Sequence, residues 1–76
     1  MEPRQTPDLG ERLRQLRELA GLTQNELAKK ARVQQSVIWA VEAGKQKSMN
    51  LHTALRIAEV LGVSLDLLAG RRGPLA

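Results

Sequence analysis

The sequence predicts an all-α protein with a single domain, and three observations lead to this fold class. Apolar residues recur at spacings of three and four along most of the chain, which is the period of an amphipathic helix. Glycines and cap-forming residues separate these stretches, and no stretch alternates apolar and polar residues as a strand does. The 76 residues suffice for one small core. We therefore expect one helical domain over residues 7–70, without repeats or an interior linker.

The first helix is expected to begin at Pro7 and to end before Gly21, which can adopt the left-handed backbone of a helix end. Thr6 is its candidate N-cap, and Asp8 in the first turn favours the helix dipole. The apolar stripe of this helix comprises Leu9, Leu13, Leu16 and Ala20. Residues 1–6 are expected to be flexible.

Two short helices joined by a tight turn are expected next, at about 24–32 and 35–43. Thr23 and Glu26 have the spacing of a capping box, in which each side chain accepts a hydrogen bond from the backbone amide of the other residue. Leu22 and Leu27 flank this cap as a hydrophobic staple. Gln34 is a weaker N-cap, so the start of helix 35–43 is less well defined by its sequence.

Helix 35–43 has one apolar side, formed by Ile38 and Val41, and Gly44 ends it. Ser36, Ala40 and Ala43 project from the opposite side. A helix this short docks by one edge and leaves its other face free. A free helix face held rigidly at the surface is what recognition of a DNA major groove requires.

Two further helices follow a polar loop. Asn50 can cap the first of them, whose expected apolar stripe comprises Leu51, Leu55, Ala58 and Leu61 before Gly62. Ser64 can cap a short last helix that contains Leu65, Leu67 and Leu68. Residues 71–76 lack periodicity and are expected to be disordered.

Composition excludes several classes of protein. The chain has no cysteine and one histidine, His52, so neither a metal site of the usual kind nor a thiol nucleophile is expected. No nucleophile and base are sensibly spaced, so we expect no enzyme and no cofactor. No apolar run approaches the ~20 residues of a membrane span, and the N-terminus lacks the apolar core of a signal peptide. A cytoplasmic protein is expected.

The net charge of +4 is concentrated around helix 35–43. Within residues 29–47 only Glu42 is acidic, against five basic residues, Lys29, Lys30, Arg32, Lys45 and Lys47. This excess would attract the phosphates of DNA, although a solvated patch that keeps the protein soluble is an equal alternative.

Three sequence elements then identify a family. G-L-T-Q at 21–24, V-E-x-G-K at 41–45 and L-G-V-S-L-D-x-L at 61–68 are weak alone but specific in this order and spacing. Over roughly Leu9–Gly70 the chain resembles the Cro/CI-type (XRE-family) helix-turn-helix DNA-binding domains, most closely those of lambdoid phage repressors. The resemblance implies a compact five-helix, lambda-repressor-like fold whose second and third helices form the helix-turn-helix.

The resemblance also implies which residues read bases. Residues at the start of helix 35–43 would face base edges, and Gln35 occupies a position where similar repressors also have glutamine. A glutamine side chain can make a paired contact with adenine, a serine hydroxyl can bond several bases, and an alanine can only touch a thymine methyl group. The expected base-reading residues are Gln35, Ser36, Ala40 and Gln34.

A second set of residues would bind phosphates. Gln24 stands at the free amides of a helix start, and in similar repressors its counterpart bonds the DNA backbone. The resemblance pairs Arg17 with Glu42, which would hold helix 35–43 in place and bring Arg17 near a phosphate. The expected phosphate-binding residues are Gln24, Thr23, Arg17, Lys45, Lys47 and Asn50, with Arg71 and Arg72 as possible non-specific contributors.

Trp39 lies about a quarter turn from the buried side of its helix, and three interpretations of it stay open. It could pack on the DNA backbone, bind a protein partner, or cover the edge of the domain. His52 is expected to be an ordinary surface residue. Similar repressors form dimers through the start of their last helix, which predicts a homodimer interface at Leu65, Leu67 and Leu68.

The predicted function is that of a sequence-specific, double-stranded DNA-binding transcriptional regulator. We expect a repressor that binds a palindromic operator as a symmetric dimer. The alternative is an antitoxin-like or regulatory module that holds a protein partner through Trp39 and Leu67. Genes adjacent on the genome would separate these possibilities, because a neighbouring toxin or restriction gene would change the biological role.

Overall fold

The computed structural model describes residues 8–70, and all regular structure within this range is helical. Five helices follow one another: α1 (Leu9–Leu19), α2 (Gln24–Ala31), α3 (Gln35–Glu42), α4 (Leu51–Leu61) and α5 (Leu65–Ala69). The all-α prediction is confirmed, and each helix begins and ends within two residues of the expected position. The expectations for Thr6, Pro7, Arg71, Arg72 and both terminal segments lie outside the described residues.

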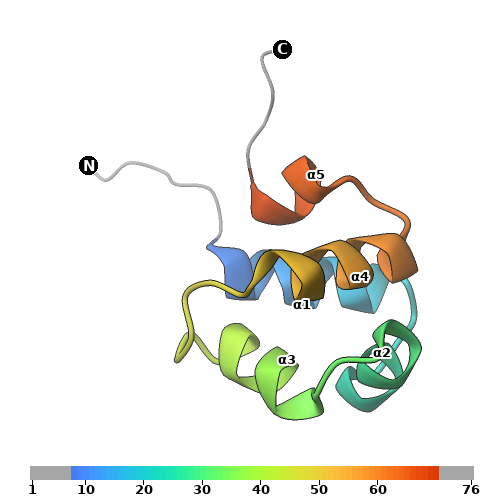
Figure 1. Cartoon of the computed structure of the whole chain (residues 1–76), viewed down its shortest axis with the longest axis horizontal. Helices are drawn as coiled ribbons and strands as arrows, with labels where there is room; N and C mark the ends of the chain where they lie inside the picture. Colours follow the sequence, from blue (N-terminus) through green and yellow to red (C-terminus); the bar gives the residue numbers. More distant parts are fainter. Residues whose placement is uncertain (1–7, 71–76) are drawn as a thin grey trace.

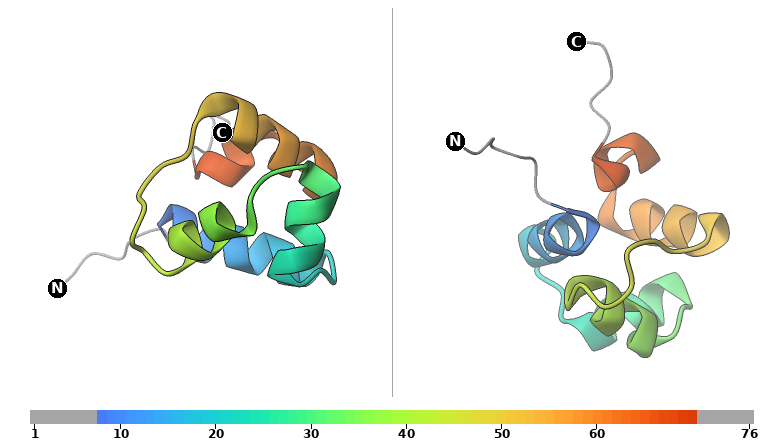
Figure 2. Two further views of the ribbon diagram at one scale, coloured as in Figure 1. Left: turned by 60° about the horizontal axis from the view of Figure 1, so that its bottom comes forward. Right: turned by 90° about the vertical axis from the view of Figure 1, so that its left-hand side faces the viewer.

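α1 and α4 form the middle of the molecule, with α2 and α3 on one side and α5 on the other (Figure 1). α3 packs against α1 and α2, whereas α5 packs against α1 and α4. The turned views in Figure 2 show that α2 and α3 together form one end of the molecule. The helix-turn-helix is therefore presented at a surface, and α1 and α4 form the platform behind it.

The start of α1 differs from the expectation. Asp8 is the N-cap rather than a first-turn residue, because its extended backbone lets one carboxylate oxygen accept from the amide of Glu11 at 3.0 Å. Aspartate is among the best N-cap residues, since its short side chain reaches a free amide of the first turn. At the other end Ala20 is exposed, because it follows the helix as its C-cap and Gly21 (φ +75°) then turns the chain.

The other predicted caps are present. Thr23 and Glu26 form the complete capping box, with N–O distances of 3.0 and 2.9 Å. Asn50 and Ser64 each accept a hydrogen bond at 3.0 Å from the amide three residues ahead. Gln34 makes no side-chain cap, as its residue type suggested.

The core is a single aliphatic cluster between the helices. Its fully buried larger side chains come from all five helices: Leu13, Leu27, Ile38, Val41, Ile57 and Leu68. The predicted stripe of α4 is only half correct: Ala58 is buried and Leu61 packs against the core, but Leu51 and Leu55 are 60% and 45% exposed. α4 packs on α2 and α5 together, and the face between those neighbours carries Ile57, which was not predicted, beside Ala58.

No described helix has the length and hydrophobicity to cross a membrane. Within residues 8–70, histidine and acidic side chains do not gather in a group that could hold a metal ion.

Candidate nucleic-acid interface

α3 has one buried side and one free side. Ile38 and Val41 are fully buried against α1 and α2, which fixes the orientation of the helix about its own axis. Gln35 and Ser36 are exposed at its first turn, and Ala40 is half-buried one turn later. Gln34 is exposed just before the helix. The structure thus brings all four predicted base-reading residues to the start and free side of one helix.

α1 holds α3 through a close backbone approach at Gly10. A Cβ atom on Gly10 would overlap the carbonyl oxygen of Val41 and lie 3.2 Å from the Cα of Glu42. Only glycine fits between the two helices at this point. Gly10 was not among the predicted site residues, although a glycine inside a predicted helix is a signal of close packing.

A hydrogen-bonded network holds the C-terminal end of α3. Arg17 Nε donates to Glu42 Oε2 at 2.7 Å, and Arg17 Nη2 donates to Glu42 Oε1 at 2.9 Å. The same guanidinium donates through Nη1 to the carbonyl oxygen of Leu22 at 2.9 Å. The hydrogen bond to Glu42 raises the pKa of Arg17 and outweighs the desolvation that would lower it. The ion pair predicted between α1 and α3 is therefore present in bidentate form.

Gln24 joins this network from the start of α2. Its Nε2 donates to Glu42 Oε1 at 3.0 Å, so the carboxylate of Glu42 accepts from two helices at once. The side chains of Arg17 and Glu42 are only 12% and 5% exposed. Arg17 thus fixes α3 in place and offers little surface for a direct phosphate contact.

The start of α2 and the start of α3 border the same surface hollow. Thr23, Gln24, Asn25 and Gln35 line it together with Arg17. The free amides at the N-terminus of α2 are suited to bind an anion, since a helix N-terminus carries partial positive charge. A predicted base reader therefore lies beside a site suited to a phosphate.

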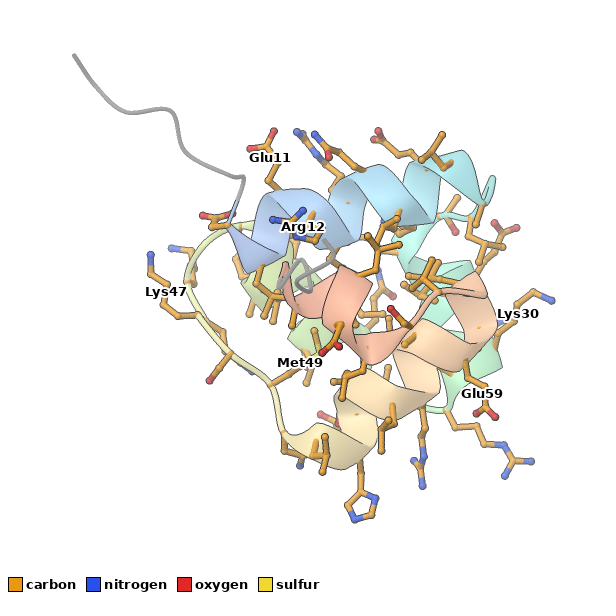
Figure 3. All side chains as sticks on the ribbon, turned by 90° about the horizontal axis from the view of Figure 1, so that it is seen from above. Glu11, Arg12, Lys30, Lys47, Met49 and Glu59 are labelled. Atoms are coloured by element: carbon orange, nitrogen blue, oxygen red, sulfur yellow. The ribbon has the colours of Figure 1, made fainter. Side chains whose placement is uncertain are left out.

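Basic residues follow α3 in the loop before α4. The amide of Lys45 donates to the carbonyl oxygen of Ala40 at 2.9 Å, which folds the loop back onto the end of the helix. Lys45 and Lys47 are exposed, and Figure 3 shows Lys47 pointing away from the molecule. Met49 from the same loop packs against the core. The exposed cap residue Asn50 follows at the start of α4.

Trp39 is 50% exposed on α3, and Lys45 Nζ lies 5.9 Å from the centre of its ring. A cation at this distance over an indole face is attracted to it. The half-exposure expected from the sequence is therefore present, and the tryptophan is paired with one of the predicted phosphate-binding lysines.

A second group of basic residues surrounds the turn between α2 and α3. Arg32 adopts left-handed backbone geometry (φ +61°), the only positive φ outside glycine among residues 8–70. Arg56 of α4 donates to the carbonyl oxygen of Arg32 at 3.4 Å. Lys29 and Lys30 are exposed in the last turn of α2. The charges at the end of α2 were expected from the sequence, but the position of Arg56 near Arg32 was not.

The predicted dimer residues have different environments. Leu68 is buried in the core and presents almost no surface. Leu67 is 48% exposed, and Leu65 is half-buried beside Leu55 and Val63. Leu55 of α4 thus borders the same hollow as Leu65 of α5, whereas Leu67 lies about 200° from Leu65 around α5.

Two comparisons place this geometry among known proteins. The sequence model of the helix-turn-helix domain family matches residues 8–70, which include all five helices. Among solved structures, the chain is similar to the restriction-modification controller protein C.AhdI from Aeromonas hydrophila, with 33% sequence identity and a TM-score of 0.73. That similarity covers 79% of this chain and 89% of the controller protein. A comparison with curated proteins found no match.

Proposed function

The chain belongs to the helix-turn-helix domain family, and from this premise we propose that it represses transcription as a symmetric dimer on a palindromic operator. Such domains bind double-stranded DNA with the second helix of the motif in the major groove. The chain is accordingly a DNA-binding transcriptional regulator. The observation that carries the proposal is the rigidly held α3, whose free side presents Gln35 and Ser36.

Base recognition is assigned to the first turns of α3. In this proposal Gln35 makes a paired contact with adenine, Ser36 bonds a neighbouring base edge, and Ala40 touches a thymine methyl group. Gln34 lies at the edge of this surface and supplements it.

Phosphate binding is assigned to residues on both sides of α3. The hydroxyl of Thr23 and the amide of Gln24 bind one phosphate, since the amide of Thr23 already donates to Glu26. Lys45, Lys47 and Asn50 follow the DNA backbone beyond the end of the helix. Arg17 supports phosphate binding indirectly, because it holds Glu42 and Glu42 accepts a hydrogen bond from Gln24. These contacts carry no sequence information, but they set the register of α3 in the groove.

Dimer formation is assigned to the exposed leucines of α4 and α5. Leu67 and Leu55 leave about half of each side chain in water, and Leu51 of α4 is also exposed. A two-fold axis beside Leu67 would bury its side chain against the same residue of a second copy. This assignment keeps Leu67 as the central residue, adds Leu55, and leaves Leu68 to the core.

A narrower biological role is favoured by the similarity to C.AhdI. We propose that this cytoplasmic regulator controls the genes of a restriction-modification system, as the name of that protein states of it. Restriction and modification genes beside the coding sequence would support this role, and their absence would leave the DNA-binding chemistry unaffected.

Selection of bound sites from randomised duplex DNA tests the function. We expect one palindromic consensus, and an affinity that falls by about 10³-fold or more between about 50 and 200 mM salt if six or more phosphates are contacted. Absence of duplex binding at low salt would reject the function.

A pair of variants then tests the division of roles. Gln35→Ala should lose about 1–3 kcal/mol of discrimination at one base position, because its contact reads that base. Lys47→Ala should weaken binding to all sequences about equally, because a phosphate contact is common to them. Identical behaviour of the two variants on single-base operator changes would contradict the assignment.

A further inference from the structure

Trp39 is the only aromatic residue of the chain, and it is not in the core. Large aromatic side chains usually stabilise a fold by burial. A domain of this size needs its large apolar side chains in the core. Half of the Trp39 side chain nevertheless remains in water. Its position therefore needs a reason other than the stability of the isolated domain.

The helical period places Trp39 on the free side of α3. Successive residues are about 100° apart around a helix, so Trp39 lies about 60° from Ser36, and Ala40 lies about 40° from Ser36 in the other direction. Ile38 and Val41, which are fully buried, occupy the opposite side. Trp39 thus belongs to the same exposed arc as the predicted base readers and follows Gln35 by about one helical turn.

Lys45 restricts the orientation of the indole. Its ammonium lies over the ring, and the loop that carries it is fixed to the end of α3 by the hydrogen bond from its own amide to Ala40. An indole covered on one face and anchored at one end loses less conformational entropy on binding than a free side chain does. The arrangement is preorganised for contact with a surface in front of α3.

We propose that Trp39 is a specificity-determining residue whose indole packs against the 5-methyl group of a thymine in the major groove. This inference rests on the proposed function. The thymine methyl is the one apolar group that the four base pairs present in that groove, and it complements the apolar exposed face of an indole. A cytosine at the same place carries a hydrogen atom where thymine carries the methyl group, so the indole would lose this contact.

DNA fits this position better than a protein partner does. Trp39 stands between Ser36 and the C-terminal end of α3, so a protein bound to it would also cover Gln35 and Ser36. The positive charge of Lys45 beside the ring favours a polyanion. A contact with DNA would involve the indole, Lys45 and the predicted base-reading residues at the same time.

Replacement of single thymines by uracil in the selected duplex provides the main test, because uracil lacks only the methyl group. We expect one position in each half-site at which uracil weakens wild-type binding by about fourfold, as for the loss of one buried methyl group. Trp39→Ala should bind the unmodified duplex about tenfold more weakly and be indifferent to uracil at that position. Leu19→Ala, which shortens another exposed apolar side chain at the end of α1, should retain both the affinity and the uracil effect.

Tryptophan fluorescence gives a second readout that needs no substitution. Since the chain has one tryptophan and no tyrosine, its emission reports Trp39 alone. The selected duplex should shield the fluorescence from acrylamide, and a duplex without the consensus should shield it less.

The outcomes distinguish a failure of the proposed DNA-binding function from a failure of the role of Trp39. Absence of wild-type binding to any duplex rejects the proposed function and the role of Trp39 together. Specific wild-type binding in which Trp39→Ala loses affinity equally for all sequences, with no uracil position affected, identifies a backbone contact and overturns only base reading. Unchanged binding and unchanged quenching would leave the indole to a protein partner and would equally overturn the proposal.

Discussion

The contact between α1 and α3 is closely packed, whereas the face formed by α4 and α5 leaves apolar side chains exposed. On the face between α1 and α3, Gly10 lets two backbones meet, and Arg17 and Glu42 form a bidentate ion pair that is almost buried. On the face formed by α4 and α5, Leu55 and Leu67 remain about half-exposed. Specific contacts are thus concentrated where a helix is held rigidly, whereas the face of α4 and α5 leaves apolar side chains partly in water.

The difference follows from the weakness of α3 by itself. With eight residues it is too short to be a stable helix in water, and neither a side-chain cap nor an acidic first-turn residue supports its start. Its position must therefore come from neighbouring helices. If this comparison is right, changes between α1 and α3 should damage folding most, and changes on α4 and α5 should mainly affect assembly.

Breaking the ion pair should have the largest effect. Arg17→Met leaves the carboxylate of Glu42 nearly buried without its cation, which should lower the free energy of unfolding by about 3 kcal/mol. Urea denaturation measures this loss. The control Arg14→Met removes the exposed pair with Glu11 at 3.4 Å and should cost less than about 0.5 kcal/mol.

A double variant sharpens the same prediction. Replacing Glu42 by leucine in the Arg17→Met protein removes the unpaired charge and should recover part of the lost stability. Equal losses in Arg17→Met and Arg14→Met would show that the pair between α1 and α3 behaves as a surface salt bridge.

Gly10→Ala should come second, and its sign is diagnostic. Helix propensity alone predicts a gain of about 1 kcal/mol for this change. The added Cβ would instead meet the backbone of α3 at Val41, which should cost about 1–3 kcal/mol as in other overpacked sites. Thermal unfolding decides between the two, with Gln15→Ala on the exposed side of α1 as the control. A stabilised Gly10→Ala protein would refute the close approach.

Leu67→Glu should weaken the dimer by about tenfold or more, because the interface would then bury a carboxylate. Folding should be almost unaffected, since half of the side chain is already in water. Sedimentation with and without the selected duplex measures the effect, and Leu19→Glu introduces the same charge on another exposed leucine. Unchanged cooperativity on DNA in Leu67→Glu would exclude this face as the interface.

The smallest effect is expected at the turn between α2 and α3. Arg32→Gly should raise the free energy of unfolding by about 0.5–1 kcal/mol, because glycine adopts a φ of +61° without strain. Lys30→Gly removes the same charge from the last turn of α2, where the backbone is helical, and should cost up to about 1 kcal/mol. Two losses of equal size would show that the left-handed backbone of Arg32 stores no strain.

Much of the site could be predicted because it depends on a short stretch of chain. The order of Gln34, Gln35 and Ser36 ahead of the buried Ile38 determines which residues stand at the free start of α3. The arginine partner of Glu42 followed only from the family resemblance, and the bond from Gln24 to the same carboxylate was not predicted. A glutamine that looks free for a phosphate in the sequence is thus partly occupied in the fold.

Most helix ends could be predicted from the sequence, because caps are local, although α1 starts at Leu9 and not at Pro7. Thr23 with Glu26, Asn50 with Thr53 and Ser64 with Leu67 are each three residues apart, so their hydrogen bonds form wherever the chain begins a helix. Only the tertiary structure decided which apolar residues are buried. Ile57 rather than Leu55 enters the core, and Leu68 rather than Leu67, because the neighbouring helices select the buried face and a leucine-rich stretch offers more than one.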